Sequence, residues 1–265
     1  MLYCPITSGS KGNCHFIAGE GTAVLVDAGT NAKNITAQLA TLGVRPGELS
    51  GILLTHEHID HIAALEVLVR KNGLSVYCNE ATMEAVLKRF PSMDTAAFNI
   101  FRTGESFYID DLEITPFKTP HDAAESVGYS IGCGLRRVCI ATDIGHMTKS
   151  LAQQLEGAQL VCIESNHDEK MLAEGPYPFA LKRRILGSNG HLSNTNCGRT
   201  LCSLLDKGLC QAVLCHLSHQ NNTPELAYRT VAQELLSAGA SLPVDIAYQD
   251  RRGAVYDIAR ITHGR

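Results

Sequence analysis

The sequence predicts an α/β fold, in which short strands alternate with amphipathic helices. In the first half, the apolar runs at 22–27 and 51–55 have the length and β-branched content of strands, and helical periodicity follows each of them. The second half repeats this order, from a strand at 158–164 to a helix opened by Thr223 and Pro224. Such alternation is typical of layered proteins in which helices cover the faces of a sheet.

Length and composition indicate an ordinary globular protein. The chain has 265 residues, of which 45% are hydrophobic, so it can bury a full core. No low-complexity linker interrupts it, and we expect a single domain spanning 1–265 and made of two α/β halves. No apolar run approaches the ~20 residues of a membrane span, and the N-terminus has no basic region, so we expect no membrane association and no secretion.

Cysteine usage and charge narrow the cellular setting. The ten cysteines form no C-x-x-C pair and stand mostly in apolar runs, which suits a reducing cytoplasm. The net charge of −4 gives no global attraction to nucleic acid. Local basic patches could still form at Arg136-Arg137, Lys182-Arg183-Arg184 and Arg251-Arg252, although such clusters are usually solvated surface.

Taken in order, the elements begin with strands at 2–7 and 14–18, joined by a turn rich in Gly, Ser and Asn at 8–13. A hairpin loop explains this turn, but its backbone N–H groups could also cradle an anion, with Asn13 as an added donor. The strand at 22–27 ends in Asp27, which could shape a site or cap a turn. Asn31 then begins a helix that runs to about Gly43.

Residues 51–61 hold the densest group of metal-ligand side chains in the chain. A strand-like run stops and is followed, within six residues, by His56, His58, Asp60 and His61. Imidazole and carboxylate are the groups that borderline divalent metals take from proteins. His56 and His58 can point the same way in extended backbone, whereas Asp60 begins a helix, so the two pairs diverge toward neighbouring ions.

The later elements are predicted from the same signals. A meander of several strands is expected from about Phe98 to Asp143, with turns at Gly104-Glu105 and Asp110-Asp111. Ser193 or Asn194 caps a helix that extends to about Lys207. The remaining expected elements are helix 62–72, strand 75–78, helix 80–90, strand 158–164, a helix near 177–186, strand 211–215, a helix from Thr223 to about Ala238, and weak strands at 244–247 and 255–258.

The H-x-H-x-D-H pattern at residues 56–61 resembles that of the metallo-β-lactamase superfamily, which implies a four-layer αββα sandwich. Two metals need about three more ligands, and His121, Asp143 and His216 each follow an apolar strand. They fall where the superfamily places its third histidine, its bridging aspartate and its last histidine. The resemblance therefore assigns His56, His58 and His121 to one metal and Asp60, His61 and His216 to the other, with Asp143 between them.

Other stretches resemble the YycJ/WalJ-like branch, from about Ile6 to about Ala227. They are 8–14, 119–123, 164–168, 177–185, 190–194, and 216–218 with Asn221-Asn222. This resemblance implies a DNA exonuclease acting in the 5′ to 3′ direction. Phe179 stands where we expect Trp in that branch, a change expected to affect packing rather than chemistry.

The expected chemistry is phosphodiester hydrolysis with two divalent ions, for which zinc, manganese and iron all suit the N/O ligand set. Ions ~3.5–4 Å apart can share an activated hydroxide and neutralise the phosphate. Asp60 and Asp143 would position the ions and orient that hydroxide, and His191 or His167 would protonate the leaving oxygen. Alternatively, His191 supports the helix that follows it, and His167 orients ligands through Glu164 or Asp168.

Two other function classes remain open. The same metal pair could hydrolyse a small ester, lactone or lactam, in which case we expect a deep apolar pocket mouth without phosphate-binding groups. A redox di-iron centre or an inert binding module is the other class, but redox members of the superfamily tend to have a carboxylate at the position of His58. The prediction is therefore a metal-dependent nuclease, with DNA as its nucleic acid substrate.

Overall fold

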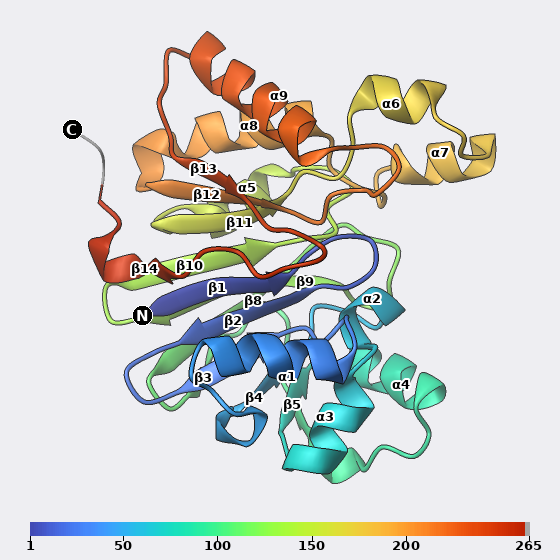
Figure 1. Cartoon of the computed structure of the whole chain (residues 1–265), viewed down its shortest axis with the longest axis vertical. Coiled ribbons are helices and arrows are strands. Elements are labelled where there is room, and N and C mark those ends of the chain that lie inside the picture. Colours follow the sequence, from blue (N-terminus) through green and yellow to red (C-terminus); the bar gives the residue numbers. More distant parts are fainter. Residues whose placement is uncertain (263–265) are drawn as a thin grey trace.

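The protein is a four-layer sandwich. The structure, a computed structural model, describes residues 1–262. Two seven-stranded sheets lie face to face, and helices cover the outer face of each, α1 and α3 on one side and α8 and α9 on the other (Figure 1). The predicted αββα architecture is confirmed.

The first sheet comes mainly from the first hundred residues. Its strand order is β14-β1-β2-β3-β4-β5-β6, and the strands from β3 to β6 run parallel. The strands are β1 (Leu2–Thr7), β2 (Cys14–Ala18), β3 (Ala23–Val26), β4 (Gly51–Leu53), β5 (Val76–Cys78), β6 (Phe98–Ile100) and β14 (Tyr256–Asp257). The helices packed on it are α1 (Ala32–Thr41), α3 (Leu65–Asn72) and α4 (Glu80–Arg89).

The second sheet has the order β13-β12-β11-β10-β9-β8-β7, in which β10 to β13 are parallel. Its strands are β7 (Phe107–Ile109), β8 (Leu112–Lys118), β9 (Val127–Cys133), β10 (Arg136–Ala141), β11 (Leu160–Glu164), β12 (Gln211–Cys215) and β13 (Val244–Ile246). The helices packed on it are α5 (Lys149–Leu155), α8 (Asn194–Leu204) and α9 (Pro224–Ser237).

Short elements complete the chain. Helix α2 (Ile59–Ile62) lies beside the ends of the first sheet, and α6 (Glu169–Glu174) and α7 (Phe179–Ile185) form a lobe that projects beyond the second sheet (Figure 1). Single 3₁₀ turns occur at Pro46–Glu48, Thr95–Ala97, Leu205–Lys207 and Ile258–Arg260. Within the described residues, every helix is too short or too polar to cross a bilayer.

Polar side chains define where the main helices begin. Thr223 caps α9 by accepting from the backbone N of Leu226, with Pro224 at the first helical position, as the sequence predicts. Ser193 caps α8 in the same way, accepting from Asn196. These side chains satisfy backbone N–H groups that have no partner within the helix, which makes each helix start at a fixed residue.

The core has three layers of buried apolar side chains. The central layer lies between the sheets and contains Val24, Ile140 and Val213, all fully buried. The outer layers lie between each sheet and its helices. Strands β11 and β12 are buried along their whole length, as expected for parallel strands covered on both faces. Each fully buried Leu, Ile or Val contributes about 1.5–3 kcal/mol, so the core holds the strand ends in a fixed relation.

Three details differ from the sequence prediction. Strand β6 pairs with β5 in the first sheet, so the meander begins at β7. The helix expected to continue from Asp60 is divided into α2 and α3, because Ala28 donates to the carbonyl of His61 and accepts from the backbone N of Ala64. Helices α5 and α6 were not predicted. They have only seven and six residues, too few for a clear period.

Gly29 allows the loop after β3 to pack closely against the metal-ligand motif at residues 56–61. A Cβ added at Gly29 would lie 1.6 Å from the carbonyl oxygen of Asp60, whereas one added at Gly21 would meet no atom within 4 Å. We therefore expect Gly29→Ala to lower the free energy of unfolding by about 3 kcal/mol, because the backbone carrying Asp60 must move. Gly21→Ala is the matched control and should change it by less than about 1 kcal/mol. Urea denaturation of both variants tests this, and equal stabilities would contradict the close packing.

Candidate metal centre

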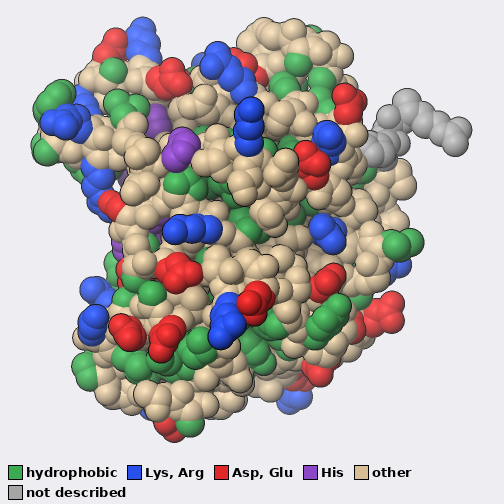
Figure 2. Space-filling model, turned by 180° about the vertical axis from the view of Figure 1, so that it is seen from behind, with side chains coloured by type: hydrophobic (Ala, Val, Ile, Leu, Met, Phe, Trp, Pro, Cys, Tyr) green, Lys and Arg blue, Asp and Glu red, His purple; other side chains and the backbone are tan. Residues whose placement is uncertain are grey.

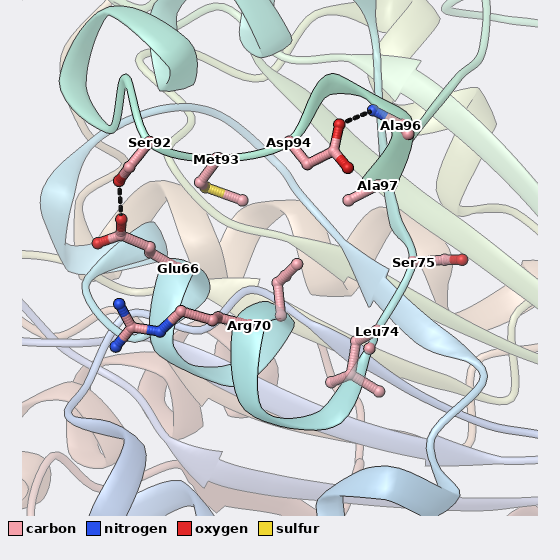
Figure 3. Close-up of a pocket in the computed structure, with 11 residues that line it drawn as sticks. Glu66, Arg70, Leu74, Ser75, Ser92, Met93, Asp94, Ala96 and Ala97 are labelled. Carbon is pink, nitrogen blue, oxygen red and sulfur yellow. Dashed lines mark hydrogen bonds between the residues drawn. The ribbon is translucent and has the colours of Figure 1, made fainter.

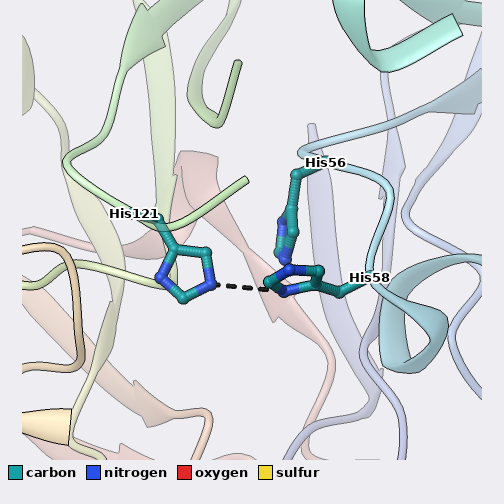
Figure 4. Close-up of side chains that lie close together, drawn as sticks. All are labelled: His56, His58 and His121. Atoms are coloured by element: carbon teal, nitrogen blue, oxygen red, sulfur yellow. Dashed lines mark hydrogen bonds between the residues drawn. The ribbon is translucent and has the colours of Figure 1, made fainter. Parts of the chain in front are cut away.

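The structure brings all seven predicted ligands together at one end of the two sheets. His56 follows β4, and His121, Asp143 and His216 follow β8, β10 and β12. Parallel neighbouring strands place their carboxyl ends at the same edge, so residues far apart in the sequence converge there. Figure 4 shows His56 and His58 approaching from one loop and His121 from the opposite side.

Left-handed turns direct three of the strand ends into the cluster. Asp27, Asp143 and His216 have φ values of 63°, 55° and 53°, in a region that non-glycine residues seldom adopt. Each turn makes the chain leave its strand abruptly and points the side chain across the sheet edge. Backbone strain of this kind is found at functional sites, where the surrounding structure maintains it.

The first group of ligands is His56, His58 and His121. The Nε2 of His121 lies 3.3 Å from the Nδ1 of His58, and the ring centroids of His56 and His121 are 5.1 Å apart (Figure 4). The Nε2 of His56 is buried and has no hydrogen-bond partner among the described residues. Ligand atoms bound at about 2.0–2.1 Å around a tetrahedral ion lie roughly 3.3 Å apart, so this spacing fits one metal.

The second group is Asp60, His61 and His216. The Oδ2 of Asp60 lies 3.4 Å from the Nε2 of His216 and 3.6 Å from the Nε2 of His61. Asp143 stands between the groups: its Oδ2 is 3.3 Å from His61, and its Oδ1 is 3.5 Å from His121. The buried Oδ2 of Asp143 has no hydrogen-bond donor in the described chain. This arrangement is what a carboxylate shared by two metals requires.

Buried carboxylates orient the rings of His61 and His216 by contacting the ring nitrogen that faces away from the cluster. The Nδ1 of His61 is 2.7 Å from the Oδ2 of Asp27, and the Nδ1 of His216 is 2.8 Å from the Oε1 of Glu164. A proton on Nδ1 satisfies both contacts and leaves Nε2 unprotonated toward the cluster. Carboxylates that hold metal-binding histidines in this way set the ring orientation and raise ligand basicity.

Burial and charge set the ionisation of the cluster. Burial and the neighbouring His61 hold the pKa of His56 well below its ordinary value, which favours the neutral ring that a metal needs. Burial would also lower the pKa of His61, but Asp27 and the other carboxylates raise it to about 10. Metal binding at His61 would therefore release a proton.

His191 lies beside the ligands and shares Glu164 with them. Its Nδ1 is 2.8 Å from the Oε1 of Glu164, and its side chain remains 19% exposed. Burial alone would lower the pKa of His191, but Glu164 and Asp143 raise it. Ligand atoms of Asp143, Glu164, His191 and His216 also fall within 4.8 Å of one another, so His191 could reach a metal as well as a substrate.

Gly190 sets the position of His191. A Cβ added at Gly190 would lie 2.1 Å from the carbonyl oxygen of Ile185, the last residue of α7. The backbone N of His191 donates to the same carbonyl at 2.9 Å. This hydrogen bond and the close approach of Gly190 hold the backbone of His191 against the end of α7.

His167 is not brought to the cluster. It is buried, and neither ring nitrogen has a hydrogen-bond partner in the described chain. No hydrogen bond joins its ring to Glu164 or Asp168 among the described residues, and a role in orienting ligands stays a prediction. Its contact with the site is through the backbone, where its carbonyl accepts from Asn194. His167 and His191 are both single histidines outside the motif at 56–61, so the sequence alone does not tell their roles apart.

The turn at 8–13 supports the metal ligands. The Oδ1 of Asn13 accepts from the backbone N of Gly9 and the hydroxyl of Ser8, and the same hydroxyl accepts from the backbone N of His216. The backbone N of Lys11 donates to Gln249. Most backbone N–H groups of the turn at 8–13 therefore donate to acceptors within the protein, and the anion-cradle interpretation is wrong.

A polar pocket of about 220 Å³ opens onto the ligands. Arg184 lines it, together with Asn166 and Ser218, and the guanidinium of Arg184 is paired with Asp122. A larger pocket of about 460 Å³ lies beside α3 and shares no lining residue with the metal centre; a hydrogen bond joins Glu66 and Ser92 across it (Figure 3). The chemistry is therefore concentrated at the smaller pocket.

Comparison with known proteins identifies the family. Residues 22–217 match the beta-lactamase superfamily domain. The chain is 36% identical over 250 residues to exodeoxyribonuclease WalJ of Streptococcus pneumoniae, with 94% of this chain and 93% of that protein covered. The chain belongs to the metallo-β-lactamase superfamily. Exodeoxyribonuclease YycJ of Bacillus anthracis is 36% identical over 239 residues, with 90% of each covered, so the chain lies in the YycJ/WalJ-like branch of the superfamily.

A solved structure supports the same fold. The metallo-β-lactamase fold protein YhfI from Bacillus subtilis superposes with a TM-score of 0.72 at 19% sequence identity, covering 97% of this chain and 100% of that one. The metallo-β-lactamase fold implies divalent metal ions, and the paired ligand groups with their buried, unpartnered atoms fit such ions.

Two residues of the site were underestimated from the sequence. The sequence interpretation considered Glu164 only as a partner for His167. Yet Glu164 is the last residue of β11, a position comparable to those of Asp143 and His216, which follow the ends of β10 and β12. That strand-end position was the available signal. Arg184 was counted with a surface patch, and only the packing of α7 over the ligands brings it to the pocket.

Removing the shared carboxylate should empty the centre. We expect Asp143→Ala to lose both ions, because Asp143 contacts each ligand group. Elemental analysis of the purified variant measures this, with the exposed Asp206→Ala as a control that should keep the wild-type metal content. Full metal content in Asp143→Ala would show that it does not serve both ions.

Asp27 offers a test of the supporting acceptors. Asp27→Asn keeps the shape of the side chain but removes the charge behind His61, so we expect metal affinity to fall about 10- to 100-fold. Competition with a chelator measures the affinity. Asp110→Asn is the matched control, since Asp110 also has left-handed backbone (φ 48°) but lies outside the cluster. Equal losses of metal affinity in the two variants would indicate a general effect of replacing an aspartate that has left-handed backbone conformation.

Proposed function

We propose that this protein is a metal-dependent exodeoxyribonuclease that hydrolyses phosphodiester bonds of DNA from the 5′ end. The observation that carries the proposal is the 36% identity, over nearly the whole chain, to proteins named exodeoxyribonucleases. The paired ligand groups beneath a polar pocket support it, because this arrangement suits hydrolysis of an anionic substrate. The ten free thiols support a reducing compartment, for which we propose the cytoplasm.

The proposed metal cofactors are two divalent ions, with zinc, manganese and iron all suited to these nitrogen and oxygen ligands. His56, His58 and His121 would hold one, and Asp60, His61 and His216 the other, with Asp143 shared. Such a pair lowers the pKa of water toward neutrality and neutralises charge on phosphate oxygens. Asp60 is less buried than Asp143, with 23% of its side chain exposed, and this exposure supports our proposal that Asp60 orients water in the pocket.

His191 is the proposed proton donor to the leaving oxygen. Its Nδ1 faces Glu164, which leaves Nε2 as the nitrogen available to a substrate. Glu164 favours the protonated ring and keeps its own charge, since its pKa, which burial would raise, is lowered by His191 and His216. We do not propose His167 for this role, because its ring is buried and does not line the pocket.

The pocket favours a phosphodiester over a small neutral ester. A lactone or lactam hydrolase would be expected to have a deep apolar mouth, whereas this pocket is small and includes Arg184, Asn166 and Ser218. A guanidinium is a strong phosphate partner because it presents several N–H donors and a permanent charge. Arg184 is held in place by Asp122, so it is positioned before the substrate arrives.

Substrate topology and salt provide a direct test. Linear DNA should be degraded and covalently closed circular DNA should not, since an exonuclease needs an end. Degradation should also weaken by about 10-fold between roughly 50 and 200 mM salt if two phosphates are contacted. Equal degradation of linear and closed DNA would reject the exonuclease activity while retaining a nuclease.

Paired histidine variants separate proton donation from metal binding. His191→Ala should keep both ions and lower kcat by about 10²–10⁴-fold, as expected for loss of a positioned acid. His216→Ala should lose an ion. Metal content and single-turnover cleavage are measured for both. If His191→Ala also loses an ion, His191 is a ligand; if it cleaves at the wild-type rate, it has only a structural role.

A further inference from the structure

A second groove adjoins the metal pocket. It has a volume of about 610 Å³, nearly three times that of the metal pocket at about 220 Å³. One wall is the motif segment 57–60, and the opposite wall is the end of α4, where Lys88 and Arg89 lie. Arg184 lines both hollows, as do His58 and Asp60, so the two are continuous.

The charges of the groove differ from those of the metal pocket. Lys88 and Arg89 are exposed in the last turn of α4, and in the described part of the chain neither is paired with a carboxylate. Glu57 and Asp60 are the acids that line the groove, but one oxygen of Glu57 already accepts from the backbone N of Ala124, its other oxygen is buried, and Asp60 lies on the metal-pocket side, 3.4 Å from the Nε2 of His216. The solvent-facing side of the groove is therefore cationic. In Figure 2, Lys and Arg side chains lie above and below the histidines at the left edge.

An apolar side chain completes the groove. Ile59 is 46% exposed although it stands between His58 and Asp60, next to the metal centre. A surface with an exposed apolar side chain beside cations suits a nucleic acid strand. The sugars and bases of the strand pack on the apolar side chain, and its phosphates pair with the cations.

We propose that this groove holds the part of the DNA strand next to the scissile bond, with Lys88 and Arg89 binding its phosphates and Ile59 contacting its sugars or bases. This inference rests on the proposed function and deepens it. Arg184 would serve the phosphate at the junction of the two hollows. The substrate is thus a strand that extends beyond the bond being cut, and dinucleotides are poor substrates.

The test reverses the two charges and compares two substrates. In Lys88→Glu/Arg89→Glu, the ratio of kcat/KM for a single-stranded oligonucleotide to that for bis(p-nitrophenyl) phosphate should fall at least about 10-fold. The salt dependence of oligonucleotide binding should also become shallower by about two units of slope, because two phosphate contacts are lost.

A matched control exists in α3. Arg70 and Lys71 are also exposed and occupy the last turn of their helix, so Arg70→Glu/Lys71→Glu makes the same change in net charge and helix-end electrostatics outside the groove. This control should keep the wild-type ratio. If the kcat/KM ratio of the control variant falls as far as that of the α4 variant, a general effect of charge explains both results and the inference is overturned.

Binding separates the inference from the proposed function. Fluorescence anisotropy with a cleavage-resistant phosphorothioate oligonucleotide measures affinity in the holoenzyme whether or not DNA is cut. Weaker binding by the α4 variant alone supports the groove, even if wild-type protein fails to cleave DNA and the exonuclease proposal falls. Wild-type affinity in the α4 variant, or no binding by the wild-type protein, overturns the groove.

Discussion

The buried negative charge of Asp27, Asp143 and Glu164 is the constraint on which the centre depends. An ionised carboxylate taken out of water costs several kcal/mol unless cations and hydrogen bonds compensate it. Here the compensation comes from imidazoles that reach the carboxylates from both sheets, with contacts as short as 2.7 Å. The histidines need the acids for orientation, and the acids need the histidines for charge. Neither set would be stable at this depth without the other, and divalent ions satisfy both.

The two sheets each supply part of this mutually dependent cluster. His56 and His61 come from the first sheet, whereas Asp143 and His216 come from the second. The apolar layer between the sheets fixes their separation, and the closely packed backbone of Gly29 and Asp60 fixes the motif against its neighbours. Positional precision at the ligands is thus a property of the core rather than of the loops that carry them.

Sequence reasoning worked best where local pattern and chemistry coincide. Strand-end position identified His121, Asp143 and His216, because a strand that stops at a polar residue is visible in the sequence and parallel strands share an edge. It failed where tertiary contacts decide. The break between α2 and α3 follows from hydrogen bonds to Ala28, and the position of His191 follows from the close approach of Gly190 to α7. No periodicity records such contacts.

The left-handed backbone at Asp143 has an evolutionary consequence. Glycine adopts that conformation freely, whereas an aspartate there costs of order 1 kcal/mol and leaves a buried charge to be compensated. A lineage released from selection for catalysis could replace Asp143 by glycine and relieve this turn, but His61 and His216 would then lose a buried counter-charge, and the metals would be lost. Two opposing effects, relief of backbone strain and loss of the counter-charge, would set the stability of such a descendant, so its soluble abundance would not report its activity. Aspartate at this turn is therefore retained against the backbone preference for glycine by the charge that it supplies to the ligand cluster.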